Sequence, residues 1–190
     1  AHASGVKVVC PAFPADAKGL MIASIRDNNP VVFYEHKGLY RKIKEEVPEG
    51  DYCIPLGKAR VVREGSDCSI IAYGSAVHFA LEAAENLAVE HGYKVEVVDI
   101  RTLVPFDEET VLASARKTGR VVIAHEASLT AGFGGEIAAR IADKAFEYLD
   151  APLKRVAAYD APTPFAPTLE KAVLPNAAKV RQAVEELLRY

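Results

Sequence analysis

The chain alternates between short apolar runs and longer segments in which apolar residues recur every three or four positions. Residues 120–149 (RVVIAHEASLTAGFGGEIAARIADKAFEYL) show both patterns in succession. Residues 121–124 are all apolar, as is typical of a strand covered on both faces. Polar residues return at His125, and a small-residue loop follows. From Glu136 the spacing predicts an amphipathic helix with two apolar rows, Ile137, Ile141 and Ala145 in one and Ala138, Ala142, Phe146 and Leu149 in the other.

The same two patterns predict the remaining elements. Apolar runs predict strands over residues 6–10, 31–34, 58–63, 68–73, 95–99 and 153–157. Helical spacing predicts helices over residues 16–27, 75–92, 107–119 and 176–188. Asp16, Ser75 and Asp107 are the predicted N-caps, and Gly92 is a predicted helix end. Residues 160–167 (DAPTPFAP) contain three prolines and predict an extended loop.

This order of elements divides the chain into three parts. Residues 1–45 hold a strand–helix–strand unit that is too small to stand alone, so they indicate the tail of a preceding domain. Residues 46–57 are a predicted linker, within a charged stretch that Pro48 and Gly50 interrupt. In residues 58–190, strands alternate with helices, which predicts a mostly parallel sheet with helices on both faces. The absence of an initial Met suggests a fragment or a processed product.

Composition narrows the class of protein. With 190 residues, 50% of them hydrophobic, the chain can bury a real core. The net charge of −3 and the scattered Lys and Arg residues argue against a nucleic-acid partner. No apolar stretch has the length of a membrane-spanning helix, and no signal peptide is visible. Three widely spaced cysteines predict reduced thiols in a cytosol-like compartment, with Cys68 an inert core thiol.

The loop between the strand at 121–124 and the following helix is the first candidate site, because ligands of parallel sheets bind past the carboxyl ends of strands. Residues 132–135 (GFGG) at a helix start could hold an anion. Their spacing fits neither a dinucleotide nor a Walker motif, which favours close helix–strand or subunit packing. His125 and Glu126 could form an acid–base pair that His78 approaches, but neighbours on a strand point to opposite faces.

A second candidate lies where the first helix ends, in the sequence SIRDNN of residues 24–29. The last carbonyl groups of a helix lack internal partners and carry partial negative charge. With the side chains of Asp27 and Asn29, hard oxygen ligands for a hard cation come together within one turn. Ordinary turn formation is the alternative explanation for the same residues.

Several of these segments also carry a family likeness, which extends over essentially the whole chain. The segments are GVKVVCP, DAKGLMIASIRDNNPVVFYEHKGLY, EEVPEGDYCIPLGKA, DIRTLVPFD, KTGRVVIAHEA and YDAPTPFAP. The chain resembles the carboxyl-terminal portion of the beta subunit of a thiamine-diphosphate-dependent 2-oxoacid dehydrogenase. That enzyme is the decarboxylating component of pyruvate or branched-chain 2-oxoacid dehydrogenase complexes. DIRTLVPFD alone would fit the wider transketolase superfamily.

The resemblance implies a fold and a reaction. Residues 1–45 would end a pyrimidine-binding domain, and residues 58–190 would form a transketolase carboxyl-terminal domain, a three-layer α/β/α sandwich. The intact assembly would decarboxylate a 2-oxo acid and reductively acylate a lipoyl group. Thiamine diphosphate would be bound outside this chain, with its diphosphate on the alpha subunit and its activating glutamate in the missing amino-terminal part. His2 then has no catalytic role, and the fragment alone would be inactive.

The resemblance also implies sites and partners. A potassium ion would lie at Ser24, Ile25, Asp27 and Asn29, where Ser24 replaces a common Ala. The partners would be the alpha subunit, a second beta subunit and the subunit-binding domain of the dihydrolipoyl acyltransferase, docked near Asp150 and Tyr190. The location would be the cytoplasm, or the mitochondrial matrix in a eukaryote. HEASLTAGF and YDAPTP lean towards a branched-chain substrate. The alternatives are an assembly module without catalysis and a nucleotide-binding α/β domain.

Overall fold

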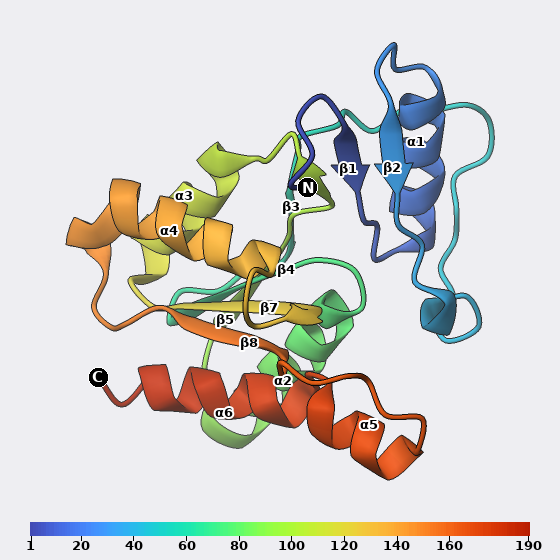
Figure 1. Ribbon diagram of the computed structural model, residues 1–190. Helices are drawn as coiled ribbons and strands as arrows, with labels where there is room; N and C mark the ends of the chain where they lie inside the picture. The colour runs from blue at the N-terminus through green and yellow to red at the C-terminus, as the bar shows by residue number, and fades with distance from the viewer.

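In the computed structural model, which describes residues 1–190, two sheets lie in adjoining units (Figure 1). The smaller sheet has the strand order β2-β1-β6. It consists of β1 (Lys7–Val9), β2 (Val31–Phe33) and β6 (Thr102–Val104), with α1 (Pro14–Ile25) between β1 and β2. β1 is parallel to β2, with Val8 opposite Val32, and antiparallel to β6, with Val8 opposite Val104. β6 therefore ties the first unit to the second.

The larger sheet has the order β3-β5-β4-β7-β8 and is parallel except for the edge strand β3. Its strands are β3 (Arg60–Arg63), β4 (Cys68–Ala72), β5 (Val95–Asp99), β7 (Val121–Ser128) and β8 (Lys154–Ala158). The helices around it are α2 (Ala76–His91), α3 (Glu108–Thr118), α4 (Phe133–Ala145), α5 (Pro167–Val173) and α6 (Ala177–Leu187). Short 3₁₀ turns cover Lys37–Leu39 and Phe146–Tyr148. No helix combines the length and the apolar character needed to cross a bilayer.

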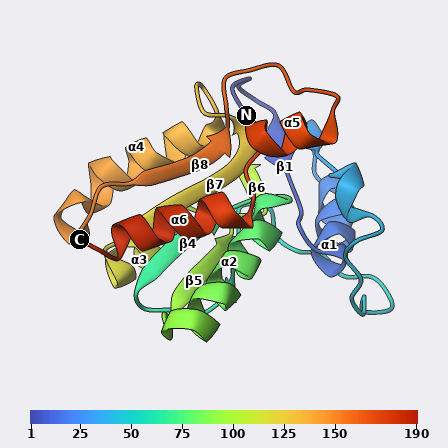
Figure 2. The same ribbon diagram turned by 90° about the horizontal axis from the view of Figure 1, so that it is seen from below.

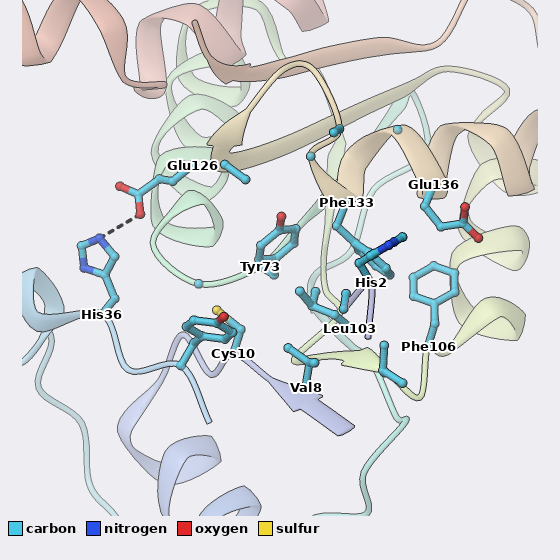
Figure 3. A pocket seen from close by; sticks show the side chains of 18 of the residues that line it. His2, Val8, Cys10, His36, Tyr73, Leu103, Phe106, Glu126, Phe133 and Glu136 are labelled. Atoms are coloured by element: carbon cyan, nitrogen blue, oxygen red, sulfur yellow. Dashed lines mark ion pairs between the residues drawn. The ribbon is translucent and has the colours of Figure 1, made fainter. Parts of the chain in front are cut away.

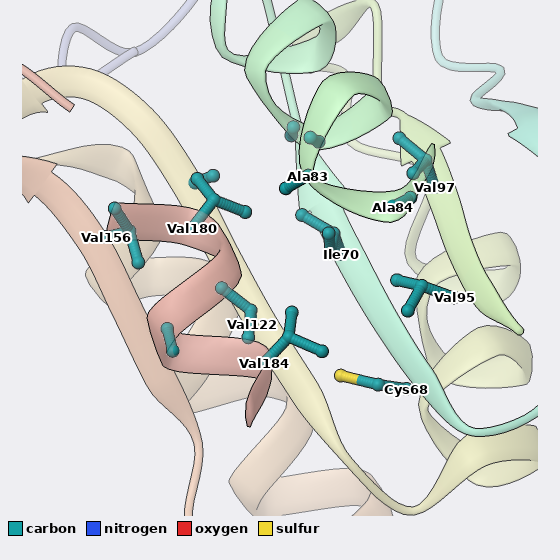
Figure 4. Close-up of a cluster of buried hydrophobic side chains, with 14 of the residues drawn as sticks. Cys68, Ile70, Ala83, Ala84, Val95, Val97, Val122, Val156, Val180 and Val184 are labelled. Atoms are coloured by element: carbon teal, nitrogen blue, oxygen red, sulfur yellow. The ribbon is translucent and has the colours of Figure 1, made fainter. Parts of the chain in front are cut away.

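Helices cover both faces of the larger sheet, so the predicted three-layer sandwich is confirmed (Figures 1 and 2). Ile70 of β4 and Val122 of β7 pack against α2 and α6, where Val180 and Val184 are fully buried (Figure 4). The opposite face of the same strands packs against α3 and α4.

Alternate residues of a strand point to opposite faces, so a central strand covered on both faces is apolar at most positions. This explains the apolar runs in the sequence. Ser69 of β4 and Glu96 of β5 are buried exceptions, and both are hydrogen-bonded to the Ser114 hydroxyl.

The connections reverse direction between β4 and β7. From β4 the chain passes through α2 to β5 on one side, whereas from β7 it passes through α4 to β8 on the other. α2 lies on one face of the sheet and α4 on the opposite face. The segments that follow β4 and β7 therefore separate and leave a crevice at the carboxyl ends of these strands, as is usual at such a reversal point.

A buried arginine joins the two units. Arg101, between β5 and β6, donates from Nη1 to Asp16 Oδ1 of α1 at 2.9 Å. It also donates to the main-chain oxygens of Lys58 at 3.0 Å and Ala59 at 3.2 Å, directly after the predicted linker. Asp16 receives a second ion pair from Arg60 at 3.2 Å. One guanidinium thus binds α1 of the first unit to the first residues of the second unit.

The predicted N-caps differ in outcome. Asp107 is confirmed, because its Oδ1 accepts a hydrogen bond from Thr110 N at 3.2 Å. Asp16 is wrong as a cap: α1 begins at Pro14, which suits the first helical position, and the Asp16 carboxylate is used by Arg101 instead. Ser75 occupies the N-cap position, but its hydroxyl makes no capping bond. Gly92 ends α2 in the left-handed conformation, at φ 72°, as predicted.

Three other expectations need correction. α4 begins at Phe133 and not at Glu136, so the glycines belong to its first turn. Its second predicted apolar row is wrong at Ala142 and Phe146, which are exposed. The proline-rich loop was expected to run to residue 167, and α5 starts at that residue. β6, with only three residues, was not predicted at all.

Candidate functional site at the carboxyl ends of the central strands

A cavity of about 1210 Å³ lies at the crevice between β4 and β7 and is closed on one side by the first unit (Figure 3). The larger sheet contributes Tyr73 after β4, Glu126 of β7 and Phe133 of α4. The first unit contributes further lining residues, which are His2, Val8, Cys10, Tyr34 and His36. The loop after residue 124 was predicted as a candidate site, and the cavity does include it. The contribution of the first unit could not be predicted from residue spacing.

His125 lies behind the cavity wall and is fully buried. Its ring stacks on the Tyr73 ring, with centroids 5.7 Å apart and an interplanar angle of 8°. A Cβ atom on Gly134 would lie 2.3 Å from His125 Nε2, and one on Gly132 would lie 2.7 Å from Cε1. The glycines therefore make room for the imidazole, and the predicted helix–strand packing role of GFGG is confirmed.

Burial determines the protonation state of His125. Desolvation, which a contact with the main chain of Ala127 offsets only in part, lowers the pKa of the imidazole below its ordinary value. The ring is therefore neutral at pH 7. The expectation that polarity returns at the strand mouth with His125 is wrong, because β7 continues to Ser128 and keeps His125 inside.

His125 and Glu126 do not form an acid–base pair. Glu126 points to the other face, where its Oε2 lies 2.8 Å from His36 Nε2 in the first unit (Figure 3). His78 does not approach either residue, since its Nε2 bonds to the carbonyl of Ala12 at 2.8 Å. The histidine that meets Glu126 thus comes from the segment after β2, which sequence reasoning had not singled out.

The inner part of the cavity combines hydroxyl groups with apolar walls. The Ser75 hydroxyl is buried and has no hydrogen-bond partner. Burial raises the pKa of the Tyr73 hydroxyl, and it raises the pKa of the Cys10 thiol to about 12, so both stay protonated at pH 7. The structure holds no group of three or more His, Cys, Asp and Glu side chains arranged for a metal ion. This arrangement can bind a molecule, but it presents no activated nucleophile.

Comparison with known proteins decides the family. The family model described as "Transketolase, C-terminal domain" matches residues 57–180. The chain belongs to this family. Among solved structures, a "Split gene transketolase, inactive beta4 tetramer" superimposes with a TM-score of 0.79 and 31% identity. That match covers 97% of this chain and 57% of the other.

Relatives with named activities match over almost the whole chain. The beta subunit of acetoin:2,6-dichlorophenolindophenol oxidoreductase from Cupriavidus necator is 49% identical over 188 residues, or 99% of this chain and 55% of the relative. In Bacillus subtilis, the 2-oxoisovalerate dehydrogenase subunit beta is 47% identical and the pyruvate dehydrogenase E1 component subunit beta 48% identical. Each of these two matches covers 100% of this chain and 58% of the relative. The chain therefore spans little more than half the length of these relatives.

The predicted cation ligands lie outside the matched residues 57–180, at the end of α1. Asp27 forms an ion pair with Lys7, and its other oxygen accepts from the main-chain and side-chain nitrogens of Asn29, both at 2.9 Å. The hydrogen bond from Lys7 is the main reason that the pKa of Asp27 falls to about 2. The hydroxyl of Ser24 donates to the Leu20 carbonyl at 2.7 Å. The oxygens are close in sequence, but the ammonium group of Lys7 already balances the charge of Asp27.

The predicted docking residues of the transketolase C-terminal domain share one edge of the molecule. Asp150 Oδ2 lies 3.3 Å from Arg120 Nη1, and Arg120 Nε donates to the Leu187 carbonyl at 3.2 Å. The main-chain nitrogen of Tyr190 donates to the same carbonyl at 3.3 Å. Both side chains are exposed, so a partner can reach them together.

We predict that Gly134→Ala destabilises the protein by about 1–3 kcal/mol, because the new methyl group would overlap the His125 ring. Gly135→Ala is the matched control: its Cβ would meet only the flexible end of Arg155, at 3.4 Å. Alanine is the better helix former, so this control is expected to gain a few tenths of a kcal/mol. Urea denaturation measures the free energy of unfolding of both variants. In the double mutant with His125→Ala, the Gly134→Ala penalty should fall to the small cost of the tight contact with Ile123 Cγ2 at 3.2 Å, and an undiminished penalty would contradict the packing role.

Proposed function

We propose that the chain is part of the beta subunit of a thiamine-diphosphate-dependent 2-oxoacid dehydrogenase. The observation that carries this proposal is the 47–48% identity to beta subunits of 2-oxoisovalerate and pyruvate dehydrogenases over both units and the linker. The family match alone, at residues 57–180, would not distinguish these enzymes from other transketolase-like proteins. Residues 1–45 would then end the pyrimidine-binding domain, with residues 46–57 as linker and 58–190 as the C-terminal domain.

Within such an enzyme this part would serve assembly. The cofactor supplies the carbanion chemistry when it is bound, and the protein positions it. By resemblance, the groups that hold thiamine diphosphate lie in the alpha subunit and in the preceding part of the beta subunit, so we assign no residue of this chain to it. The proposed partners are the alpha subunit, a second beta subunit and the acyltransferase, in the cytoplasm or the mitochondrial matrix. The nucleotide-binding alternative was based on GFGG alone. The glycines of this segment make room for the His125 ring, so they no longer favour that alternative.

The full-length beta subunit, mixed with its alpha subunit and thiamine diphosphate, is expected to turn over a 2-oxo acid. Pyruvate, 2-oxoisovalerate and acetoin should be compared in an artificial-acceptor assay, since the relatives are named for all three substrates. The 190-residue chain in place of the full-length subunit is expected to show no turnover. Absence of 2-oxo acid turnover in the complete assembly would refute the proposed activity, whereas activity on acetoin alone would assign the chain to the other enzyme class.

We propose that the edge at Asp150 and Tyr190 docks the subunit-binding domain of the acyltransferase. An exposed carboxylate suits a basic partner, so Asp150→Ala should weaken binding about tenfold, the loss expected for one charge-assisted hydrogen bond. Asp143→Ala, at an exposed aspartate of α4, is the matched control and should bind like the wild type. Calorimetry with the isolated subunit-binding domain is the measurement. Equal affinity of the Asp150→Ala and Asp143→Ala variants would show that the subunit-binding domain does not dock at Asp150.

We infer that a potassium ion competes with Lys7 at the end of α1. The available ligands are oxygens of Ser24, Ile25, Asp27 and Asn29, which suit a hard monovalent cation. Binding would stabilise the folded chain by about 1.4 kcal/mol at tenfold excess over the dissociation constant. The thermal unfolding temperature in potassium chloride should be higher than that in choline chloride at equal ionic strength. Lys7→Met should enlarge this difference in unfolding temperature. Lys37→Met is the control, and the absence of any potassium-specific shift would exclude the site.

A further inference from the structure

The junction between the two units holds more buried acid than buried base. Asp16 is 3% exposed and Asp99 0%, and Arg101 is the only buried Lys or Arg of the chain. Arg60 also reaches Asp16, at 3.2 Å, but 48% of its side chain is exposed, so water weakens its effect. Two carboxylates that share one buried guanidinium would leave an excess negative charge in the interior, which is unfavourable. One of the two acids is therefore expected to hold a proton.

The hydrogen bonds identify Asp99 as the acid that holds the proton. Asp16 uses both carboxylate oxygens in ion pairs, Oδ1 with Arg101 and Oδ2 with Arg60. Asp99 accepts one hydrogen bond, from the Arg101 main-chain N–H to Oδ1 at 3.0 Å, and its Oδ2 has no partner. Burial penalises a charged oxygen that lacks a partner, which favours the neutral acid. In agreement, desolvation raises the pKa of Asp99 to about 7, against the hydrogen bond and the charge of Arg101.

The other groups around Asp99 supply no counter-charge. β3 places Arg60 opposite Asp99 in the sheet register, but the guanidinium of Arg60 bonds to Asp16. On the other side, β4 places Ala72 opposite Asp99. Burial, with a further contribution from Asp99, raises the pKa of the Cys10 thiol to about 12, so this neighbour after β1 is neutral. The charge at this position therefore depends on the proton of Asp99 itself.

Asp99 lies where its charge acts on the contact between the units. It binds the main chain of Arg101, whose guanidinium bonds to Asp16 of α1 at 2.9 Å. The carbonyl of Arg101 accepts a hydrogen bond from the Cys10 N–H at 2.8 Å, next to the pairing of β1 with β6. An ionised Asp99 would add a second negative charge beside the Arg101–Asp16 pair, with no further buried cation to balance it.

We propose that Asp99 is a pH-sensitive element of the junction: its neutral form keeps α1 and β1 packed on the second unit, and its ionised form weakens that contact. The direction follows from linkage, because the closed junction holds the proton over a pH range in which an opened junction would lose it. The stabilisation is complete below the ordinary aspartate pKa and is lost as the pH rises through the pKa of the folded chain, about 7. This role concerns the packing of the chain and does not depend on the proposed enzymatic activity.

Carbon-13 NMR of the 190-residue chain, labelled at the aspartate carboxyl carbons, measures the proton directly. The Asp99 signal can be assigned through its own main-chain resonances, so this measurement needs no variant. It is expected to titrate near pH 7, whereas an exposed aspartate titrates at about pH 4. An Asp99 signal that titrates at about pH 4 would overturn the proposal.

Amide hydrogen exchange tests the effect on the junction. After correction for the intrinsic pH dependence of exchange, the Cys10 amide should lose about tenfold in protection between about pH 5.5 and 7.5. The Ile71 amide in the central strand β4 is the internal reference for unfolding of the whole chain. Cys10 should exchange faster than Ile71 at every pH. Equal rates would mean that the proton acts on global stability only, which would refute a role at the junction.

Variants connect the pH dependence to Asp99. Asp99→Asn cannot ionise and keeps an oxygen for the Arg101 N–H, so the protection of the Cys10 amide should no longer change over this pH range. Asp143→Asn, at an exposed aspartate of α4, is the matched control and should keep the wild-type dependence. Persistence of the wild-type dependence in Asp99→Asn would contradict the proposal. No readout depends on catalytic turnover, so failure here leaves the proposed function intact.

Discussion

The structure depends on the buried ion pair between Arg101 and Asp16. Arg101 is only 8% exposed, and Asp16 only 3%. Breaking such a pair leaves one charge buried without a partner, which costs about 3–5 kcal/mol. Arg101 adopts a left-handed conformation, at φ 53°, which non-glycine residues rarely do. The surrounding contacts hold it there: its main-chain N–H donates to Asp99 Oδ1 at 3.0 Å, and its guanidinium bonds to Asp16 of α1 and to the Lys58 carbonyl. Together with the pairing of β1 and β6, this contact holds the two units that line the cavity.

Asp99 shows how tightly this junction is packed. It is fully buried at the end of β5, and one of its carboxylate oxygens has no partner. Desolvation, only partly offset by Arg101, raises the pKa of Asp99 to about 7. Its proton is therefore held by the folded state through the pH range in which an exposed aspartate is already charged. The stability that this proton contributes is largest at acidic pH and is lost as the pH rises through about 7.

The sequence was informative where a residue's role is local. Asp107 and Gly92 could be assigned because a cap acts within one turn, and the central strands could be assigned because burial on both faces favours runs of mostly apolar residues. Asp16 and His125 could not be assigned, since their partners lie elsewhere in the chain. Asp16 has the side chain of a typical N-cap, but it forms an ion pair with Arg101 instead. His125 has a side chain that is common in active sites, but it fills a space left by two glycines. β6 was missed because its pairing with β1 depends on the junction.

The comparisons do not single out one substrate. Relatives named for acetoin, 2-oxoisovalerate and pyruvate match this chain at 49%, 47% and 48% identity. Identity this similar across different substrates indicates that what the chain shares with them is a common framework, and that substrate selection is not concentrated in it. In this chain, Arg101, Asp16 and the packing around His125 fix units and elements relative to one another.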